Sequence, residues 1–248
     1  MRRARIEIIP LGPKDGIALV SANSATVGLG ALALEDAGVV LHALSASMAL
    51  SLEGFRGNLD PFDVDVTVAR MAPGQNRGIS GVMSLLEGSE LMKPGQARRV
   101  QDPLSFRCFP SVYGAAMHCL DETCRTLHNE LNEAGDNPVV LVKKQTMRST
   151  GNFDVTALVL HFEMLGQALA QNAILAAQRI ARMQSNGTSD LPRFLSPRGA
   201  MHAGLAGLVK VAAALESDIR HLAQPCSLLV MPVADGVEDY ATMAPRVV

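Results

Sequence analysis

The segment "RRVQDPLSFRCFP" contains polar side chains that could bind a ligand or take part in catalysis, within an otherwise apolar sequence. Gln101 and Arg107 lie six residues apart on either side of Pro103, so both side chains can converge from one loop. An arginine can bind a carboxylate through two parallel hydrogen bonds, which would make Arg107 a substrate-binding residue. A buried arginine also needs a partner, and Arg107 would instead hold the loop if it paired with Asp102 or another internal acid. The residues alone leave both interpretations open.

A second polar stretch, "GIALVSANSATVGLG", precedes a segment that we expect to be helical. It carries Ser21, Asn23 and Ser24. Ser and Asn are preferred at helix N-caps, where the side-chain oxygen accepts a hydrogen bond from a free backbone N–H and contributes about 1 kcal/mol. From this stretch alone, the sequence favours capping over catalysis.

The stretch "STGNFDV" combines a turn with a large apolar side chain. Gly151 and Asn152 form the turn, Phe153 follows, and Asp154 is predicted to cap a long helix. The local pattern does not by itself establish a ligand role for Phe153.

The segment "PVADGVEDYATMAP" holds an acidic cluster. Asp235, Glu238 and Asp239 surround Gly236. A solvated acidic turn is the simpler interpretation. In the alternative interpretation, Glu238 is a general acid or base, or a carboxylate that binds an amine.

Hydrophobic spacing predicts the helices that must position these residues. Apolar side chains recur every three or four positions over 154–183, which predicts one helix of about 30 residues. The stripe consists of Leu158, Phe162, Leu165, Leu169, Ala173, Ala176, Ile180 and Met183. Further helices are predicted at 24–53, 75–92, 111–133 and 200–223, and "VVLVKK" after Pro138 is a candidate short strand.

Composition points to the same fold class. Apolar residues make up 48% of the chain and aromatic residues only 4%, which suits closely packed helices better than sheets. We therefore predict an all-α fold, a long-helix bundle with a few short strands or loops. No shift in composition marks a boundary, so we expect a single helical domain over 1–248.

Charge and cysteine usage exclude several classes of function. The formal net charge is −2, so no nucleic-acid partner is predicted. The uncharged run 16–34 is as long as a membrane span, but its Ser, Asn, Thr and Gly residues favour burial in protein, and we predict no membrane association. The four cysteines form no CxxC pair and the six histidines are scattered. We predict free thiols, a cytoplasmic location and no metal site.

Six motifs occur in a recognisable order along nearly the whole chain: "GPKDGIALVSANS", "LEGFRGNLDPFD" with "PGQ", "QDPLSFRCFPSVYGAA", "NEAGDNPVV", "GNF" before a long helix, and "GVEDYATMAP". In these motifs the chain resembles the aromatic amino acid ammonia-lyases, which include histidine and phenylalanine ammonia-lyases and related aminomutases. The resemblance implies a mainly α-helical homotetramer with active sites where subunits meet. It also implies an aromatic amino acid substrate that loses ammonia to give an arylacrylate.

The resemblance assigns roles to individual residues. Arg107 matches the arginine that binds the substrate carboxylate, and Gln101 matches the glutamine near the electrophile. Phe153 matches the phenylalanine that lines the pocket, and Glu238 matches the glutamate near the substrate's amine or ring in histidine-type members. Asn23 is the nearest candidate for the family's asparagine beside the electrophile.

The family's electrophile is a 4-methylideneimidazole-5-one (MIO) group, which forms from an internal Ala-Ser-Gly. A tyrosine from the N-terminal region serves as the base. No Ala-Ser-Gly occurs in this sequence, and the region that would carry the catalytic tyrosine is absent as well. The chain therefore resembles roughly half of a family member.

Several residues depart from the family pattern. An ungapped match places Ser21, not Asn23, at the family's asparagine. Leu104 stands where many members have tyrosine, so a hydroxyl of the pocket or proton relay is missing. Val237 and Tyr240 stand where histidine-type members have Gln and His, which argues against histidine as the substrate.

Three hypotheses follow from the sequence. In the first, the chain is part of an ammonia-lyase, inactive alone and active in association with a chain that carries the missing half. In the second, it is part of an aminomutase, which uses the same residues and returns ammonia to the β-carbon. In the third, it is a non-catalytic helical oligomerisation or binding protein.

Overall fold

The computed structural model describes residues 8–70, 72–198, 201–229, 231 and 236–248. It divides into two compact units. The hairpin unit comprises Met1–Ala33, Cys124–Leu160 and Cys226–Val248, and the helical unit comprises Leu34–Thr123 and His161–Pro225.

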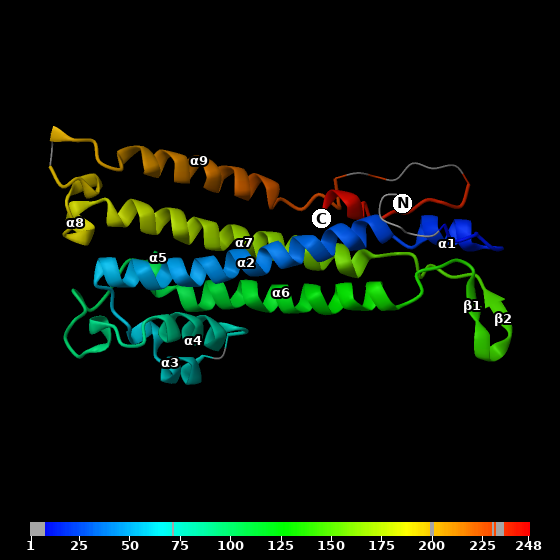
Figure 1. The fold of residues 1–248 in the computed structure, drawn as a ribbon, viewed down its shortest axis with the longest axis horizontal. Coiled ribbons are helices and arrows are strands. Elements are labelled where there is room, and N and C mark those ends of the chain that lie inside the picture. The colour runs from blue at the N-terminus through cyan, green and yellow to red at the C-terminus, as the bar shows by residue number, and fades with distance from the viewer. Residues whose placement is uncertain (1–7, 71, 199–200, 230, 232–235) are drawn as a thin grey trace. The chain divides into compact units, whose positions relative to one another are not determined.

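Helices dominate the described residues, as predicted for an all-α fold (Figure 1). The α-helices are α1 (Asp15–Ser21), α2 (Ser24–Phe55), α3 (Val64–Ala69), α4 (Gln75–Leu85), α5 (Leu104–Arg107), α6 (Phe109–Asn132), α7 (Thr156–Met183), α8 (Asn186–Ser189) and α9 (Ala206–Leu222). Short 3₁₀ helices are η2 (Asp60–Phe62), η3 (Glu90–Met92), η4 (Val142–Lys144), η5 (Arg193–Leu195) and η7 (Ala244–Arg246). The sheet that the described residues form is one antiparallel pair, β1 (Val139–Leu141) and β2 (Thr146–Arg148).

Most predicted helices are confirmed, with two corrections at their ends. The helix predicted at 75–92 ends at Leu85, because Gly88 adopts a left-handed conformation with φ of 83° that an α-helix cannot contain. The helix predicted at 200–223 begins at Ala206, after Gly204 with φ of 50°. Residues 199 and 200 lie outside the described residues. The strand predicted in "VVLVKK" is confirmed for Val139–Leu141, and the following residues form the 3₁₀ turn between the two strands.

The predicted apolar stripe of α7 is confirmed where the helix meets its neighbours. Leu158, Phe162 and Leu165 are buried, whereas Leu160 and Met164 between them are partly or largely exposed. This alternation has the period of an amphipathic helix that packs along one face.

The core of the helical unit forms where α2, α6 and α7 run side by side (Figure 1). Its largest buried side chains include Leu41, Met48, Leu52, Phe55, Val82, Phe106 and Phe109. The few aromatic residues gather here: Phe55 stacks on Phe106 with ring centroids 4.3 Å apart, and Phe109 stacks on Tyr113 at 5.0 Å. Stacked pairs of this kind add about 0.5–1.5 kcal/mol each beyond the area they bury.

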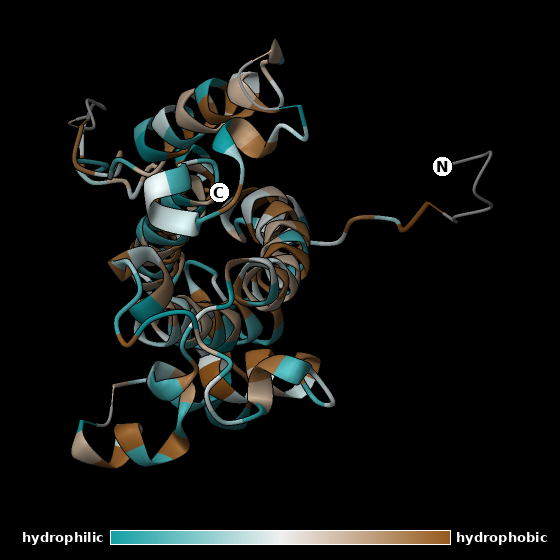
Figure 2. Cartoon of the chain, turned by 90° about the vertical axis from the view of Figure 1, so that its left-hand side faces the viewer, coloured by the Kyte–Doolittle hydropathy of each residue, from teal (hydrophilic) through white to brown (hydrophobic). Residues whose placement is uncertain are grey.

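Apolar residues also occupy exposed positions on the helices (brown in Figure 2). Helix α9 has no buried residue, yet its apolar side chains fall on one face. These are Leu208, Val211, Leu215, Ile219 and Leu222. Of the described helices, α2 is long and apolar enough to cross a membrane by length and composition, a test that core helices of soluble proteins also pass.

A close backbone contact joins the start of α4 to α6, and it depends on glycine. A Cβ built on Gly114 would lie 2.6 Å from the backbone nitrogen of Gln75, and one built on Gly74 would lie 2.1 Å from the carbonyl oxygen of Gly114. No side chain fits at these distances, so α4 and α6 can meet here only through glycine.

We expect Gly114→Ala to lower the free energy of unfolding by about 2–3 kcal/mol, because the added methyl group must push α4 away from α6. Gly166→Ala is the matched control, since Gly166 also lies inside a helix and a Cβ there meets nothing within 4 Å. The control should be neutral or stabilising by up to about 1 kcal/mol. Urea unfolding of both variants measures the difference, and equal midpoints would contradict the predicted contact.

Candidate functional site

In the hairpin unit, Asn23 contacts the turn that carries Phe153. The side-chain Nδ2 of Asn23 donates to the carbonyl oxygen of Phe153 at 2.8 Å and lies 3.4 Å from the carbonyl oxygen of Ser21. Asn23 has φ of 52°, a left-handed conformation that asparagine tolerates better than most residues. Two residues that the sequence assigned to one site are thus in contact, although 130 positions separate them.

The capping role predicted for Ser21, Asn23 and Ser24 takes a different form. The hydroxyl of Ser21 donates back to the carbonyl oxygen of Ile17 at 2.8 Å, within α1. The backbone carbonyl of Asn23 accepts from the N–H of Val27 and so begins the hydrogen bonds of α2. The side chain of Asn23 thus contacts the Phe153 turn, whereas the side chain of Ser21 stays within α1.

The "GDNP" segment, residues 135–138, also holds the Phe153 turn in place. Asp136 forms an ion pair with Lys14, in the loop before α1. The side-chain oxygen of Asn137 accepts from the N–H of Thr150 at 3.0 Å. Gly135 approaches the turn so closely that a Cβ there would lie 3.3 Å from the carbonyl oxygen of Asn152. The "KDG", "GDNP" and "GNF" motifs thus meet in the hairpin unit.

Asp154 is predicted to cap α7; its side chain does bind the first turn, but from one position before the N-cap Val155, whose carbonyl begins the helix. Asp154 accepts from the N–H of Thr156 at 3.1 Å through its Oδ1. The hydroxyl of Tyr240 lies 3.1 Å from that of Thr156, within hydrogen-bonding distance. Glu238 is exposed two residues earlier, and Asp235 lies outside the described residues. Tyr240 therefore approaches the Phe153 turn.

In the helical unit, Arg107 closes the loop that begins at Gln101. Its Nε donates to the backbone carbonyl oxygen of Asp102 at 2.7 Å. Among the described residues, no hydrogen bond or ion pair engages either Nη group of Arg107. The backbone bond thus holds the guanidinium in one orientation and leaves a pair of donors for a planar anion. Leu104 and Gln101 are exposed on the same segment.

Asp102 is a buried carboxylate that the sequence indicated only as a possible partner of Arg107. Its side chain accepts from the N–H of Asn58 at 2.5 Å. Burial raises the pKa of Asp102, and the bond from Asn58 and the charges of Arg98, Arg99 and Arg107 offset part of that effect. The ionised carboxylate is therefore destabilised in the folded chain relative to water.

This raised pKa has a consequence for stability. The carboxylate binds protons more readily in the folded state, so its contribution to stability is greatest below its ordinary pKa and is lost as pH rises through the raised value. We expect Asp102→Asn, which keeps an acceptor for Asn58, to raise the melting temperature at pH 7 and to lose this advantage near pH 4. Thermal unfolding at both pH values checks this, with Asp218→Asn, at an exposed carboxylate on α9, as the control. A constant difference at both pH values would contradict it.

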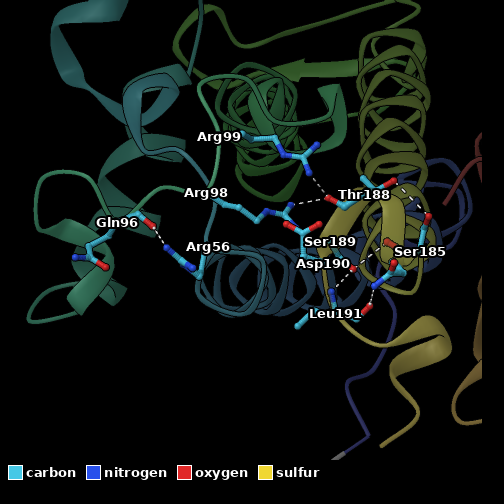
Figure 3. Close-up of polar contacts among 10 residues, drawn as sticks. Arg56, Gln96, Arg98, Arg99, Ser185, Thr188, Ser189, Asp190 and Leu191 are labelled. Carbon is cyan, nitrogen blue, oxygen red and sulfur yellow. Dashed lines mark hydrogen bonds and ion pairs between the residues drawn. The ribbon is translucent and has the colours of Figure 1, made fainter. Parts of the chain in front are cut away.

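Sequence reasoning missed three arginines that lie partly or fully inside the helical unit: Arg98 and Arg99 are half-buried, and Arg179 is buried. Arg98 and Arg99 both donate to the carbonyl oxygen of Thr188 at 2.6 Å (Figure 3). Arg179 on α7 is 2% exposed, donates to the carbonyl oxygen of Ser105 at 3.4 Å, and lies 5.4 Å from the ring centroid of Phe109. Burial lowers the pKa of Arg179 to about 10. The available signal in the sequence was an arginine between the apolar positions of the α7 stripe.

The predicted site residues divide between the two units. The hairpin unit holds Ser21, Asn23, Phe153 and Glu238, and the helical unit holds Gln101, Leu104 and Arg107. Among the residues that the structure describes, no group of three or more His, Cys, Asp or Glu side chains could hold a metal ion. A cavity of about 510 Å³ lies elsewhere in the helical unit, between η2, α3 and α4, and contains none of the predicted site residues.

Comparison with known proteins identifies the family. The model of the aromatic amino acid lyase family matches residues 1–248. Histidine ammonia-lyase from Caldanaerobacter subterraneus subsp. tengcongensis is 34% identical over 243 residues, which are 98% of this chain and 48% of that protein. The chain therefore belongs to the aromatic amino acid lyase family, as its motifs indicated.

Solved structures agree with this assignment. Ergothionase from Treponema denticola, an ergothioneine-degrading enzyme, has a TM-score of 0.92 and 30% identity over the whole chain and 50% of its own length. The phenylalanine aminomutase of Pantoea agglomerans has a TM-score of 0.89 and 26% identity over 99% of this chain and 52% of its own. The chain thus spans about half the length of these relatives, and the predicted helical fold of the family is confirmed.

Proposed function

We propose that this chain supplies the carboxylate-binding and ring-binding residues of an ammonia-lyase for an aromatic L-amino acid. The observation that carries the proposal is the state of Arg107: one nitrogen is fixed on the backbone of Asp102, and both Nη groups remain available. A guanidinium held in this way binds a carboxylate with two parallel hydrogen bonds. An α-amino acid presents that carboxylate next to the carbon that loses its amine.

The remaining residues have roles in the same reaction. Phe153 lines the pocket for the substrate ring, and Leu104 adds an apolar contact where relatives carry a hydroxyl. Asn23 fixes the Phe153 turn, and together with Ser21 in the same loop it would hold the electrophile supplied by an associated chain. Gln101 would contact that electrophile and the substrate. Glu238 accepts a hydrogen bond from the amine or from a polar ring.

The elimination breaks the Cα–N and Cβ–H bonds and forms the Cα=Cβ bond, so one amino acid gives one arylacrylate and one ammonium ion. The family's MIO group supplies an electrophile that makes the amine a better leaving group. These 248 residues contain no Ala-Ser-Gly from which it could form, and no step of this proposal passes through it. This chain's own part is to bind the carboxylate, to exclude water from the ring and to orient the Cβ–H bond.

We propose that the chain is inactive alone and becomes active with a chain that carries the electrophile and the catalytic tyrosine, in a homotetramer or a mixed assembly in the cytoplasm. The exposed apolar face of α9 supports association, because monomeric proteins rarely expose large continuous apolar patches.

Two substrate classes have specific support. Glu238 and the histidine ammonia-lyase relatives favour histidine, although Val237 and Tyr240 depart from the histidine pattern. The likeness to ergothionase, an ergothioneine-degrading enzyme, favours ergothioneine as a second candidate. An aminomutase would use the same residues and return ammonia to the β-carbon.

The test measures arylacrylate formation by ultraviolet absorbance. Histidine, phenylalanine, tyrosine and ergothioneine are supplied to the pure chain and to the chain co-expressed with the protein of the adjacent upstream reading frame (the neighbour), which is tested as the carrier of the electrophile and the catalytic tyrosine. We expect product only with the neighbour, and the best substrate identifies the subfamily. Product from the pure chain would overturn the proposed inactivity. A β-amino acid as the product would identify an aminomutase, and no product of either kind from any combination would favour a non-catalytic scaffold.

A further inference from the structure

Two adjacent arginines donate hydrogen bonds to the same backbone carbonyl oxygen in the helical unit (Figure 3). The Nη2 groups of Arg98 and Arg99 each lie 2.6 Å from the carbonyl oxygen of Thr188, at the end of α8. The Nη1 group of Arg98 also lies 3.3 Å from a carboxylate oxygen of Asp190. We call these four residues, Arg98, Arg99, Thr188 and Asp190, the arginine clamp.

The clamp is held in a defined geometry although its charges repel. The side chain of Arg98 is only 10% exposed. Burial and the neighbouring charge of Arg99 lower the pKa of Arg98, and Asp190 and Asp102 offset part of this. Two cations side by side in a poorly hydrated place are unfavourable. A surface loop would separate them, so the packing around them must fix their positions.

A chain of stacked groups links the clamp to Arg107. The guanidinium of Arg98 lies 4.2 Å from the ring centroid of Phe55, and Phe55 stacks on Phe106 at 4.3 Å. Phe106 immediately precedes Arg107 in α5. The N–H of Arg98 also donates to the carbonyl oxygen of Arg56 at 2.9 Å. The segment 98–107 is thus fixed at its first residues by α8 and near its end by Phe55.

We propose that Arg98 and Arg99 are positioning residues that hold the segment 98–107, with Gln101 and Arg107, in its binding geometry by anchoring it to α8. This inference rests on the proposed function, in which Gln101 and Arg107 contact the substrate. Gln101 lies two residues beyond Arg99 and is exposed, so its position follows that of the clamp. Binding groups must be held to within about 0.5 Å to be effective, and anchored neighbours are what provide this.

The first test is hydrogen–deuterium exchange on the pure chain. In the double variant Arg98→Gln/Arg99→Gln, we expect amide exchange over 98–107 to become at least about tenfold faster. The segment can then open locally without first breaking the hydrogen bonds and the ion pair of the clamp. Exchange in α9 and in β1 and β2 should not change. The matched control is Arg77→Gln, at an exposed arginine whose ion pair with Asp121 lies at the surface; it should leave exchange over 98–107 unchanged.

A milder variant decides the outcome if the double variant does not fold. Asp190→Asn removes a carboxylate on an exposed side chain and weakens only the ion pair to Arg98. We expect exchange over 98–107 to rise about threefold in this variant. Unchanged exchange there in a folded double variant, or in Asp190→Asn where the double variant does not fold, would overturn the proposal. An equal rise throughout the chain would also overturn it, because it would indicate general destabilisation.

A second readout separates this inference from the proposed function. In the active assembly, loosening the segment should raise KM about tenfold, since Arg107 no longer meets the carboxylate in one orientation. A merely structural effect would lower the amount of active enzyme and leave KM unchanged, which would overturn the positioning role. If no assembly forms product, the proposed function fails, and the exchange experiment still decides whether the clamp anchors the segment.

Discussion

Arg107→Ala should raise KM of the active assembly for its amino acid substrate about 100-fold. Truncating one partner of a charge-assisted pair typically costs 2–5 kcal/mol, and about 2.7 kcal/mol corresponds to that factor. The loss falls mainly on binding because the carboxylate carries its charge both before and during the elimination. Steady-state kinetics with the best substrate, once product formation is established, measure the change.

Arg107→Lys tests whether geometry or charge matters. Lysine keeps the charge but cannot form the planar bidentate pair or repeat the Nε bond to Asp102. We expect it to recover at most a small part of the binding. Arg182→Ala is a matched control, because Arg182 is an exposed arginine of the same unit that contacts Gln178. An inhibitor without a carboxylate should bind wild type and Arg107→Ala equally well. An unchanged KM with unchanged turnover would remove Arg107 from the site.

The helices could be predicted from sequence because each depends on a local pattern. The α7 stripe repeats every three or four residues, and Asp154 precedes it at capping distance. The errors fell where one glycine decides the outcome. In "LLEGSEL" the helical pattern continues beyond Leu85, but Gly88 adopts a left-handed conformation and ends it.

The candidate site could be predicted only through motif order. No local pattern indicates that Asn23 contacts the carbonyl of Phe153, or that Arg98 and Arg99 meet at Thr188. These contacts join residues about 90 to 130 positions apart, and they depend on how the helices pack. Arg107 shows what the sequence alone could not decide. The sequence left open whether it holds its loop or binds a ligand, and in the structure its Nε holds the loop while its Nη groups stay available.

The second large effect concerns Arg179, the largest of the fully buried side chains. Its hydrogen bond to Ser105 is long at 3.4 Å, and its Nε and Nη2 have no partner among the described residues. Burial lowers its pKa to about 10, so the charge is costly, yet the side chain fills space against Phe109. Replacing a poorly paired buried ion by an apolar side chain of similar volume is often neutral or stabilising.

We therefore expect Arg179→Met to be at least as stable as wild type, and Arg179→Ala to lose about 3 kcal/mol through the cavity it leaves. Because the folded pKa lies below the ordinary value, the cost of the charge is fully present below about pH 10 and is relieved as pH rises through it. The advantage of methionine should accordingly shrink above pH 10. Urea unfolding at pH 7 and pH 10.5 measures both effects. If methionine is as destabilising as alanine, the guanidinium's bond to Ser105 stabilises the segment beside Arg107, and packing alone does not explain why the arginine is there.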